Sequence, residues 1–103
     1  LSILQEKTLT HDDQVHIRKL MNSDVPEWIV FICYAARLFK WKSMVLTIRK
    51  AFHHEDHRVR KAAVTSVAEL AGPSMAPAVY PLQTDSHPEV RRAATVAYRK
   101  LDR

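Results

Sequence analysis

The sequence contains one glycine, Gly72, and one cysteine, Cys33, among its 103 residues. The shortage of glycine excludes the glycine-rich loops that bind phosphate groups. The single glycine and the near absence of runs that alternate apolar and polar residues argue against a sheet protein, which needs turns. A single cysteine cannot form an internal disulfide, so nothing points to an oxidising compartment. Cys33 lies within an apolar run, and we predict that it is a buried, small hydrophobic residue.

Long hydrophobic runs are also lacking. The longest, residues 28–36, is half as long as the ~18-residue stretch that a membrane span needs. No signal peptide is visible, and the sequence opens on Leu1 instead of methionine. We therefore expect a fragment of a longer protein, located in the cytoplasm and without a membrane span in this segment.

The overall composition is that of a folded protein with a basic surface. Hydrophobic residues make up 47% and charged residues 26%, which are ordinary values for a globular domain. The net charge of +5 is compatible with an anionic partner such as nucleic acid, an acidic protein surface or a membrane face.

Two segments recur at an interval of 31 residues. Residues 59–63 (Val-Arg-Lys-Ala-Ala) return as residues 90–94 (Val-Arg-Arg-Ala-Ala), and each copy is followed at the same offset by a leucine. Residues 17–21 (Ile-Arg-Lys-Leu-Met) return as residues 48–52 (Ile-Arg-Lys-Ala-Phe). Self-similarity at a fixed period of this size is typical of helical repeat proteins.

Capping signals and helix breakers divide the chain into helix pairs. We expect residues 1–9 to be the tail of a preceding helix, followed by repeats at 10–39, 43–71 and 74–101. The expected N-caps are Thr10 (in a capping box with Asp13), Asp24, Ser43, Asp56 and Ser86. Gly72 is expected to take a left-handed conformation after the helix that begins at Asp56, with Pro73 stopping that helix. Pro77 and Pro81 predict a short or kinked helix over about 74–82.

The second helix of the first pair, from Pro26 to about Phe39, is apolar almost all round. Such a helix is usually buried on two sides. We expect it either to be sandwiched between neighbouring helices or to cover the end of the array against something else. The 31-residue step aligns Trp28 with Val59 and Val90, which favours a core position for Trp28.

An aspartate-bearing turn followed by Val-Arg-x-Ala-Ala and a later leucine resembles the HEAT family of helical repeats. The resemblance is closest to the short-repeat branch found in phycobilisome-lyase-type proteins. It implies an all-α fold, a right-handed α-solenoid of antiparallel helix pairs with about three repeats. It also implies a ladder in which a turn aspartate and a helix arginine bridge adjacent repeats, and the residues at those positions are Asp56, Arg60, Asp85 and Arg91. The first pair departs from the pattern, because Ile29 stands where the arginine would be.

The residue pattern gives little support for catalysis or for metal binding. Residues 53–57 (His-His-Glu-Asp-His) contain metal-ligand types, but a turn interrupts them, and zinc needs four ligands in fixed geometry or three plus water. We read them as a turn with incidental histidines, with a weak nickel or zinc site as the alternative. No nucleophile elbow is present, so we expect a non-enzyme without cofactor or metal.

The basic residues stack at equivalent positions. The 31-residue step pairs Arg18 with Arg49 and Lys19 with Lys50, which predicts columns of positive charge along one edge of the array. These columns are either a solvated outer face or a docking strip, and Trp28 and Trp41 are candidate stacking residues beside them.

The first hypothesis is a non-catalytic protein-interaction, scaffolding or regulatory module whose partner is another protein or another domain of the same chain. The alternative is nucleic-acid binding through the basic columns.

Overall fold

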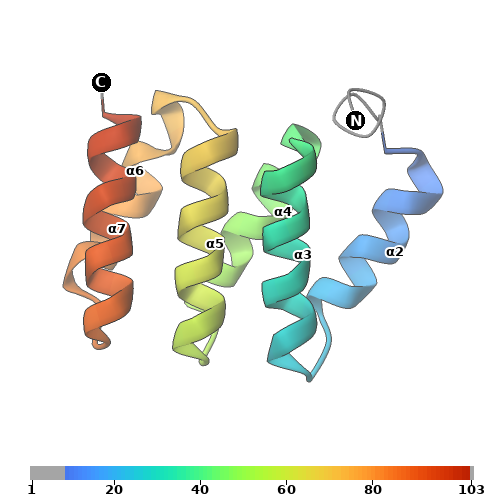
Figure 1. Ribbon diagram of the computed structural model, residues 1–103, viewed down its shortest axis with the longest axis horizontal. Coiled ribbons are helices and arrows are strands. Elements are labelled where there is room, and N and C mark those ends of the chain that lie inside the picture. The colour runs from blue at the N-terminus through green and yellow to red at the C-terminus, as the bar shows by residue number, and fades with distance from the viewer. Residues whose placement is uncertain (1–8, 103) are drawn as a thin grey trace.

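The computed structural model describes residues 9–102, and the regular structure within that range is entirely helical (Figure 1). Its helices are α2 (His11–Met21), α3 (Pro26–Phe39), α4 (Val45–Arg49), α5 (His57–Leu70), α6 (Ala76–Val79) and α7 (Pro88–Leu101). Short 3-10 helical segments flank α4 at Lys42–Met44 and Lys50–His53, and flank α6 at Pro73–Met75 and Tyr80–Thr84. The predicted all-α class is confirmed. The helical tail predicted for residues 1–9 lies, except for Leu9, outside the described residues.

The longest helices stand side by side in one layer. Figure 1 shows α3, α5 and α7 next to one another, with α4 and α6 behind them and α2 on the far side of α3. The most extensive contacts between elements are those of α5 with α7 and of α5 with α3. The middle helix of the layer is therefore packed on both flanks, and the two others have one helix of this layer beside them.

The core of this layer is made of small and branched residues at equivalent positions. Val59 and Ala63 in α5 are fully buried, and so are their 31-residue equivalents Val90 and Ala94 in α7. Alanine at such positions lets neighbouring helix axes approach toward the near end of the ~8–10 Å packing range. The repeated motif is thus a packing motif.

Two of the predicted helix starts are confirmed. Thr10 and Asp13 form a reciprocal capping box at the start of α2. Asp56 caps α5, because its Oδ1 accepts a hydrogen bond from the Arg58 N–H at 2.8 Å. The prediction of Asp24 as a cap was wrong: the N-cap of α3 is Val25, which has no capping side chain, and Pro26 follows it with a preset helical φ.

Two other predicted starts differ as well. Residues 43–52 do not form one helix capped by Ser43; a 3-10 turn, the five-residue α4 and a second 3-10 turn take its place. The N-cap of α7 is His87 instead of Ser86, and its Nδ1 accepts the Glu89 N–H at 3.2 Å. The short, interrupted helix that Pro77 and Pro81 predicted is confirmed by α6 and its flanking 3-10 turns.

The expected left-handed glycine was also wrong. Gly72 has φ −97° and ψ −171°, an extended conformation. Pro73 explains this, because a proline disfavours helical and favours extended conformations in the residue before it. The left-handed position belongs instead to Lys40, which follows α3 with φ 58° and ψ 47°. No helix in residues 9–102 is both long and apolar enough to cross a membrane.

These backbone conformations predict that opposite substitutions stabilise the fold at the two positions: alanine in place of Gly72, and glycine in place of Lys40. A Cβ built on Gly72 meets no atom within 4 Å, so Gly72→Ala should raise the free energy of unfolding by about 0.4–1 kcal/mol through loss of unfolded-state entropy. Lys40→Gly should also stabilise the fold, by about 1 kcal/mol, because it relieves a left-handed non-glycine residue. Urea denaturation would measure both. Lys40→Ala, which keeps the Cβ, is the control and should change stability by less than about 0.5 kcal/mol; a destabilised Gly72→Ala protein would contradict the backbone assignment.

Candidate functional site

The turns before α3, α5 and α7 contain the same hydrogen bond, which cannot be recognised from the sequence because a different residue type accepts it in each turn. Before α3, α5 and α7, the backbone N–H of the N-cap residue donates to a side chain two residues earlier. The acceptors are Ser23 Oγ at 3.0 Å, His54 Nδ1 at 3.0 Å and Asp85 Oδ1 at 2.9 Å. These three residues stand 31 positions apart, so the turn repeats even though its residue identity does not.

Arg60 and Asp85 join the second repeat to the third. The Arg60 guanidinium donates from Nε and Nη2 to the two carboxylate oxygens of Asp85, each at 2.9 Å. Its Nη1 also donates to the carbonyl oxygens of His54 and Glu55 at 2.8 and 3.0 Å. The two side chains are only 13% and 9% exposed. The hydrogen bonds from Arg60 lower the pKa of Asp85 despite its burial.

Two other residues of the expected ladder, Arg91 and Asp56, do not form the expected bridge between repeats. Arg91 donates from Nη1 to the Asp85 carbonyl oxygen at 2.7 Å, the same contact that Arg60 makes with the His54 carbonyl. Asp56 does not bridge directly to a neighbouring repeat; it pairs with Arg58 on its own helix at 2.8 Å, which lowers the pKa of Asp56. The 31-residue step explains the difference, because the equivalent of Asp85 is His54 and not Asp56.

The two junctions of the helix layer are therefore linked unequally. In the described chain, three ion pairs join α5 to the third repeat: Arg60–Asp85, Lys61–Glu89 and Lys100–Glu69. One ion pair, Arg58–Glu27 at 3.2 Å, joins α5 to α3. The buried Ser66 hydroxyl adds a hydrogen bond to the Cys33 carbonyl of α3. Cys33 itself is fully buried as predicted, and burial raises the pKa of its thiol to about 12, which disfavours the reactive thiolate.

Two of the six histidines lie together, in an arrangement that does not suit zinc. His57 stacks on His87 with ring centroids 3.7 Å apart and planes 6° from parallel, and Glu89 lies beside them. The lone pairs of stacked rings lie in two parallel planes that do not meet, whereas zinc at ~2.0–2.1 Å needs nitrogen lone pairs that converge on one point. His87 Nδ1 also accepts the Glu89 N–H, and the positive ends of two helices face this cluster. The stacked pair is better described as a packing contact between the starts of α5 and α7.

The basic residues of the predicted columns are all exposed, and two of them share one hollow. Arg18 and Lys50 line a depression of about 280 Å³ whose other lining residues include no carboxylate. The column ends after two repeats, because the third repeat has Tyr80 and Pro81 at the positions of Arg49 and Lys50. Lys19 is exposed on α2 next to Arg18.

The two tryptophans have opposite environments. Trp41 stacks on Phe39 with centroids 5.8 Å apart, packs against the core and has a buried indole N–H without a hydrogen-bond partner in the described chain. Trp28, which its alignment with Val59 placed in the core, is 50% exposed, while Val59 is fully buried. Ile29 takes the buried position at the start of α3 and turns Trp28 outward.

An exposed apolar stripe on α3 follows from this rotation. We call Trp28, Phe31, Tyr34 and Leu38 the α3 face; their spacing of three or four residues puts them on one side of the helix. Each is at least half exposed, and Trp28 contacts Phe31 edge-on at 6.4 Å. The described residues therefore do not cover this helix on all sides. The equivalents in α5 are Val59, Ala62, Thr65 and Glu69, so the stripe of large exposed side chains is particular to the first repeat.

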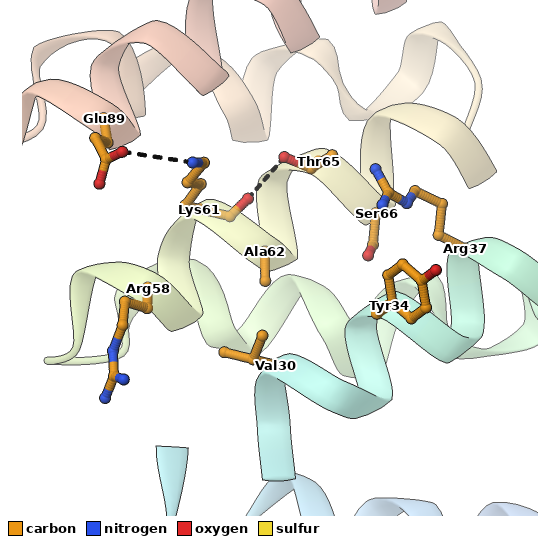
Figure 2. A pocket seen from close by; sticks show the side chains of 9 residues that line it. All are labelled: Val30, Tyr34, Arg37, Arg58, Lys61, Ala62, Thr65, Ser66 and Glu89. Atoms are coloured by element: carbon orange, nitrogen blue, oxygen red, sulfur yellow. Dashed lines mark hydrogen bonds and ion pairs between the residues drawn. The ribbon is translucent and has the colours of Figure 1, made fainter. Parts of the chain in front are cut away.

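A groove of about 440 Å³ runs between α3 and α5, beside the α3 face. Figure 2 shows Val30 and Ala62 in its middle, Arg58 toward one end, and Tyr34 and Arg37 toward the other. The Arg37 guanidinium lies 5.6 Å from the centroid of the Tyr34 ring, within cation–π range. The rest of the lining is Lys61, Thr65, Ser66 and Glu89.

The buried ion pair makes a prediction about acid stability. Because the pKa of Asp85 is lower in the folded than in the unfolded protein, its contribution is complete above the unfolded pKa near ~3.9 and is lost as the pH falls through the folded pKa. Asp85→Asn keeps an acceptor for the turn but removes the charge, and should cost about 1.5–3 kcal/mol of unfolding free energy at pH 7. The deficit relative to wild type should shrink below about pH 4 in urea titrations. Glu89→Gln, at a half-exposed pair, is the control, with an expected change below about 1 kcal/mol; equal losses for both variants would contradict the assigned role.

In a comparison with known families, a family model described as HEAT repeats matches residues 15–99. Searches of curated proteins and of solved structures gave no match.

Proposed function

Because the chain belongs to the HEAT-repeat family, whose members generally mediate protein–protein interaction, we propose that it is a non-catalytic protein-binding module within a right-handed α-solenoid. In this proposal residues 1–103 form one domain of about three repeats that scaffolds or regulates a larger protein. The partner is another protein or another domain of the same chain.

The α3 face is the observation that supports a protein partner. Large apolar side chains that are exposed together usually mark an interaction surface. Tryptophan and tyrosine are also enriched among the residues that dominate binding energy. Trp28 and Phe31 contact each other edge-on and present a preformed pair of rings. Trp41 packs against the core and stacks on Phe39, and it is not part of this face.

The protein-binding proposal predicts a selective loss of partners. The double variant Trp28→Ser/Phe31→Ser should lose, by at least about 10-fold, the proteins that the wild-type chain captures reproducibly from its native source, because hot-spot truncations cost 2 kcal/mol or more. Quantitative mass spectrometry of the captured proteins is the measurement. Leu46→Ser, which removes an equally exposed apolar residue from α4, is the control and should capture the wild-type set. An unchanged set with the double variant would refute this surface as the binding site, and unfolding curves show whether both variants are folded.

The basic columns support nucleic-acid binding as a second candidate. The specific observation is the hollow shared by Arg18 and Lys50, which gathers positive charge from two repeats without a carboxylate in its lining. Lys19 and Arg49 would add phosphate contacts on either side.

Salt dependence tests this candidate. Each phosphate neutralised contributes about −0.9 to the slope of log K against log salt, so Arg18→Ala/Lys50→Ala should flatten the slope for duplex DNA by about 1.8. Fluorescence anisotropy at several salt concentrations measures the slope. The control Arg92→Ala/Arg99→Ala removes the same charge from exposed positions on α7 and should leave most of the slope intact. Equal flattening by both double variants would show that attraction to net charge, and not the columns, accounts for binding.

A further inference from the structure

The α3 face contains positions that are buried in both of the other layer helices. The 31-residue step aligns Trp28 with Val59 in α5 and with Val90 in α7. Both valines are fully buried, whereas Trp28 is half exposed. α5 has α3 beside it and α7 has α5 beside it, but within residues 9–102 no helix of the layer lies on the other flank of α3 (Figure 1). Trp28 is therefore exposed at a position that a neighbouring layer helix covers elsewhere in the array.

Contacts between α5 and α3 identify the side of each helix that faces the helix before it. Ala62 of α5 lines the groove that also contains Val30 of α3 (Figure 2). The Ser66 hydroxyl donates to the Cys33 carbonyl oxygen of α3. Val59, Ala62 and Ser66 are spaced by three and four residues, so they share one side of α5. Their equivalents in α3 are Trp28, Phe31 and Ala35. These three residues therefore mark the side of α3 that corresponds to a junction surface.

The first helix of the pair, α2, does not close this surface. α2 packs against α3 but leaves Trp28 and Phe31 half or more exposed. Phe39 is also only partly buried, although its equivalents Leu70 and Leu101 are buried. From residue 28 to residue 39 a helix rises about 16 Å. The uncovered apolar surface is thus long enough for about three turns of a second helix.

The side chains on this surface are larger than those at the other two junctions. Phe31 stands where α5 has Ala62 and α7 has Ala93. At the α3–α5 junction, Ala62 shares its groove with Val30 of the preceding helix. Packed interfaces tolerate changes best when the total side-chain volume is kept. A helix that covers Phe31 at ordinary packing distance therefore needs small residues at the position that Val30 takes against α5.

Charge contributes little to this surface. At the α5–α7 junction, Lys100 forms an ion pair with Glu69, and the equivalent of both residues in α3 is Leu38. Glu27, at the start of α3, is already paired with Arg58 of α5. The surface therefore selects what covers it by shape and apolar contact, and not by charge.

We propose that the α3 face binds an α-helix of the partner protein that carries small residues (alanine, glycine or serine) opposite Trp28 and Phe31. The bound helix lies on the flank of α3 away from α5 and takes the place there that α3 takes beside α5. The layer formed by α3, α5 and α7 thereby continues into the partner. The proposal rests on the protein-binding function proposed above and specifies the form and chemistry of the partner. Because the contact is apolar, added salt changes the affinity little.

The test uses the complete, ¹⁵N-labelled chain and a peptide with the sequence of residues 55–72, which form α5 and its caps. A lactam between Lys61 and a His57→Glu side chain holds the peptide helical, and Ala62 and Ser66 lie on its opposite, small-residue side. NMR titration should give a Kd below about 1 mM, with the largest shift changes in α3. The absence of binding up to about 1 mM, or shift changes that are largest outside α3, overturns the proposal.

A second peptide separates complementary packing from general apolar attraction. It carries Ala62→Leu/Ser66→Leu and is otherwise identical, so it is more apolar but has no small-residue side. It should bind at least about 3-fold more weakly, because its leucines cannot pack closely on Phe31. Binding that is tighter than this limit overturns the proposal.

Matched variants of the chain locate the contact. Phe31→Ala should weaken binding of the first peptide at least about 3-fold, because it removes the ring at the centre of the contact. The control Leu46→Ala removes an equally exposed apolar residue from α4 and should change the Kd less than about 3-fold. Raising the salt concentration about 10-fold should also change the Kd less than about 3-fold. A smaller loss with Phe31→Ala, or a larger change with the control or with salt, overturns the proposal.

The two proposals fail separately. If the peptides contradict the expected results while capture of cellular partners still depends on Trp28 and Phe31, the assignment of a helix with small residues alone is wrong. If the Trp28→Ser/Phe31→Ser variant captures the wild-type set, the protein-binding function of the α3 face is wrong, and so is the inference that rests on it.

Discussion

The fold depends on the close approach of α5 to a helix on each flank. α5 is the only helix of the layer, within the described residues, that has another layer helix on both sides. Its buried residues are accordingly small or branched, and Val59, Ala63, Val64 and Val67 are all completely buried. A larger side chain at these positions would push α5 away from the elements packed against it. The proposed binding surfaces lie where this constraint ends, on the outward side of α3 and at the edges of the array.

The turn before each second helix shows how one backbone design carries different chemistry. Ser23, His54 and Asp85 occupy equivalent positions and accept the same backbone hydrogen bond. Only the carboxylate of Asp85 can also pair with an arginine across the junction, and Arg60 is in place to do so. A hydrogen-bond acceptor is therefore present at this position in each turn, but its charge differs from turn to turn. The ionic contact that the turn can make across its junction differs accordingly.

Much of the fold could be predicted from the sequence, because the information lies in local signals. The 31-residue period, the cap at Asp56 and the two interrupting prolines of the third repeat predict the helices well. Gly72 was misread because its conformation is decided by the proline that follows. The equivalence of His54 and Asp85 was missed because these residues share only the ability to accept a hydrogen bond. The exposure of Trp28 could not be predicted, since the choice between Trp28 and Ile29 for the core depends on how α3 rotates against its neighbours.

The unequal linkage of the two junctions has a mechanical consequence. Three ion pairs fasten α5 to the third repeat, and one fastens it to α3. When the array is bent or stretched, the junction with fewer cross-links is the more compliant one and deforms first. The α3–α5 groove lies at that junction, so bending of the array would change the width of the groove. Tension transmitted along the chain would therefore alter the shape of the groove before it disturbs the rest of the array.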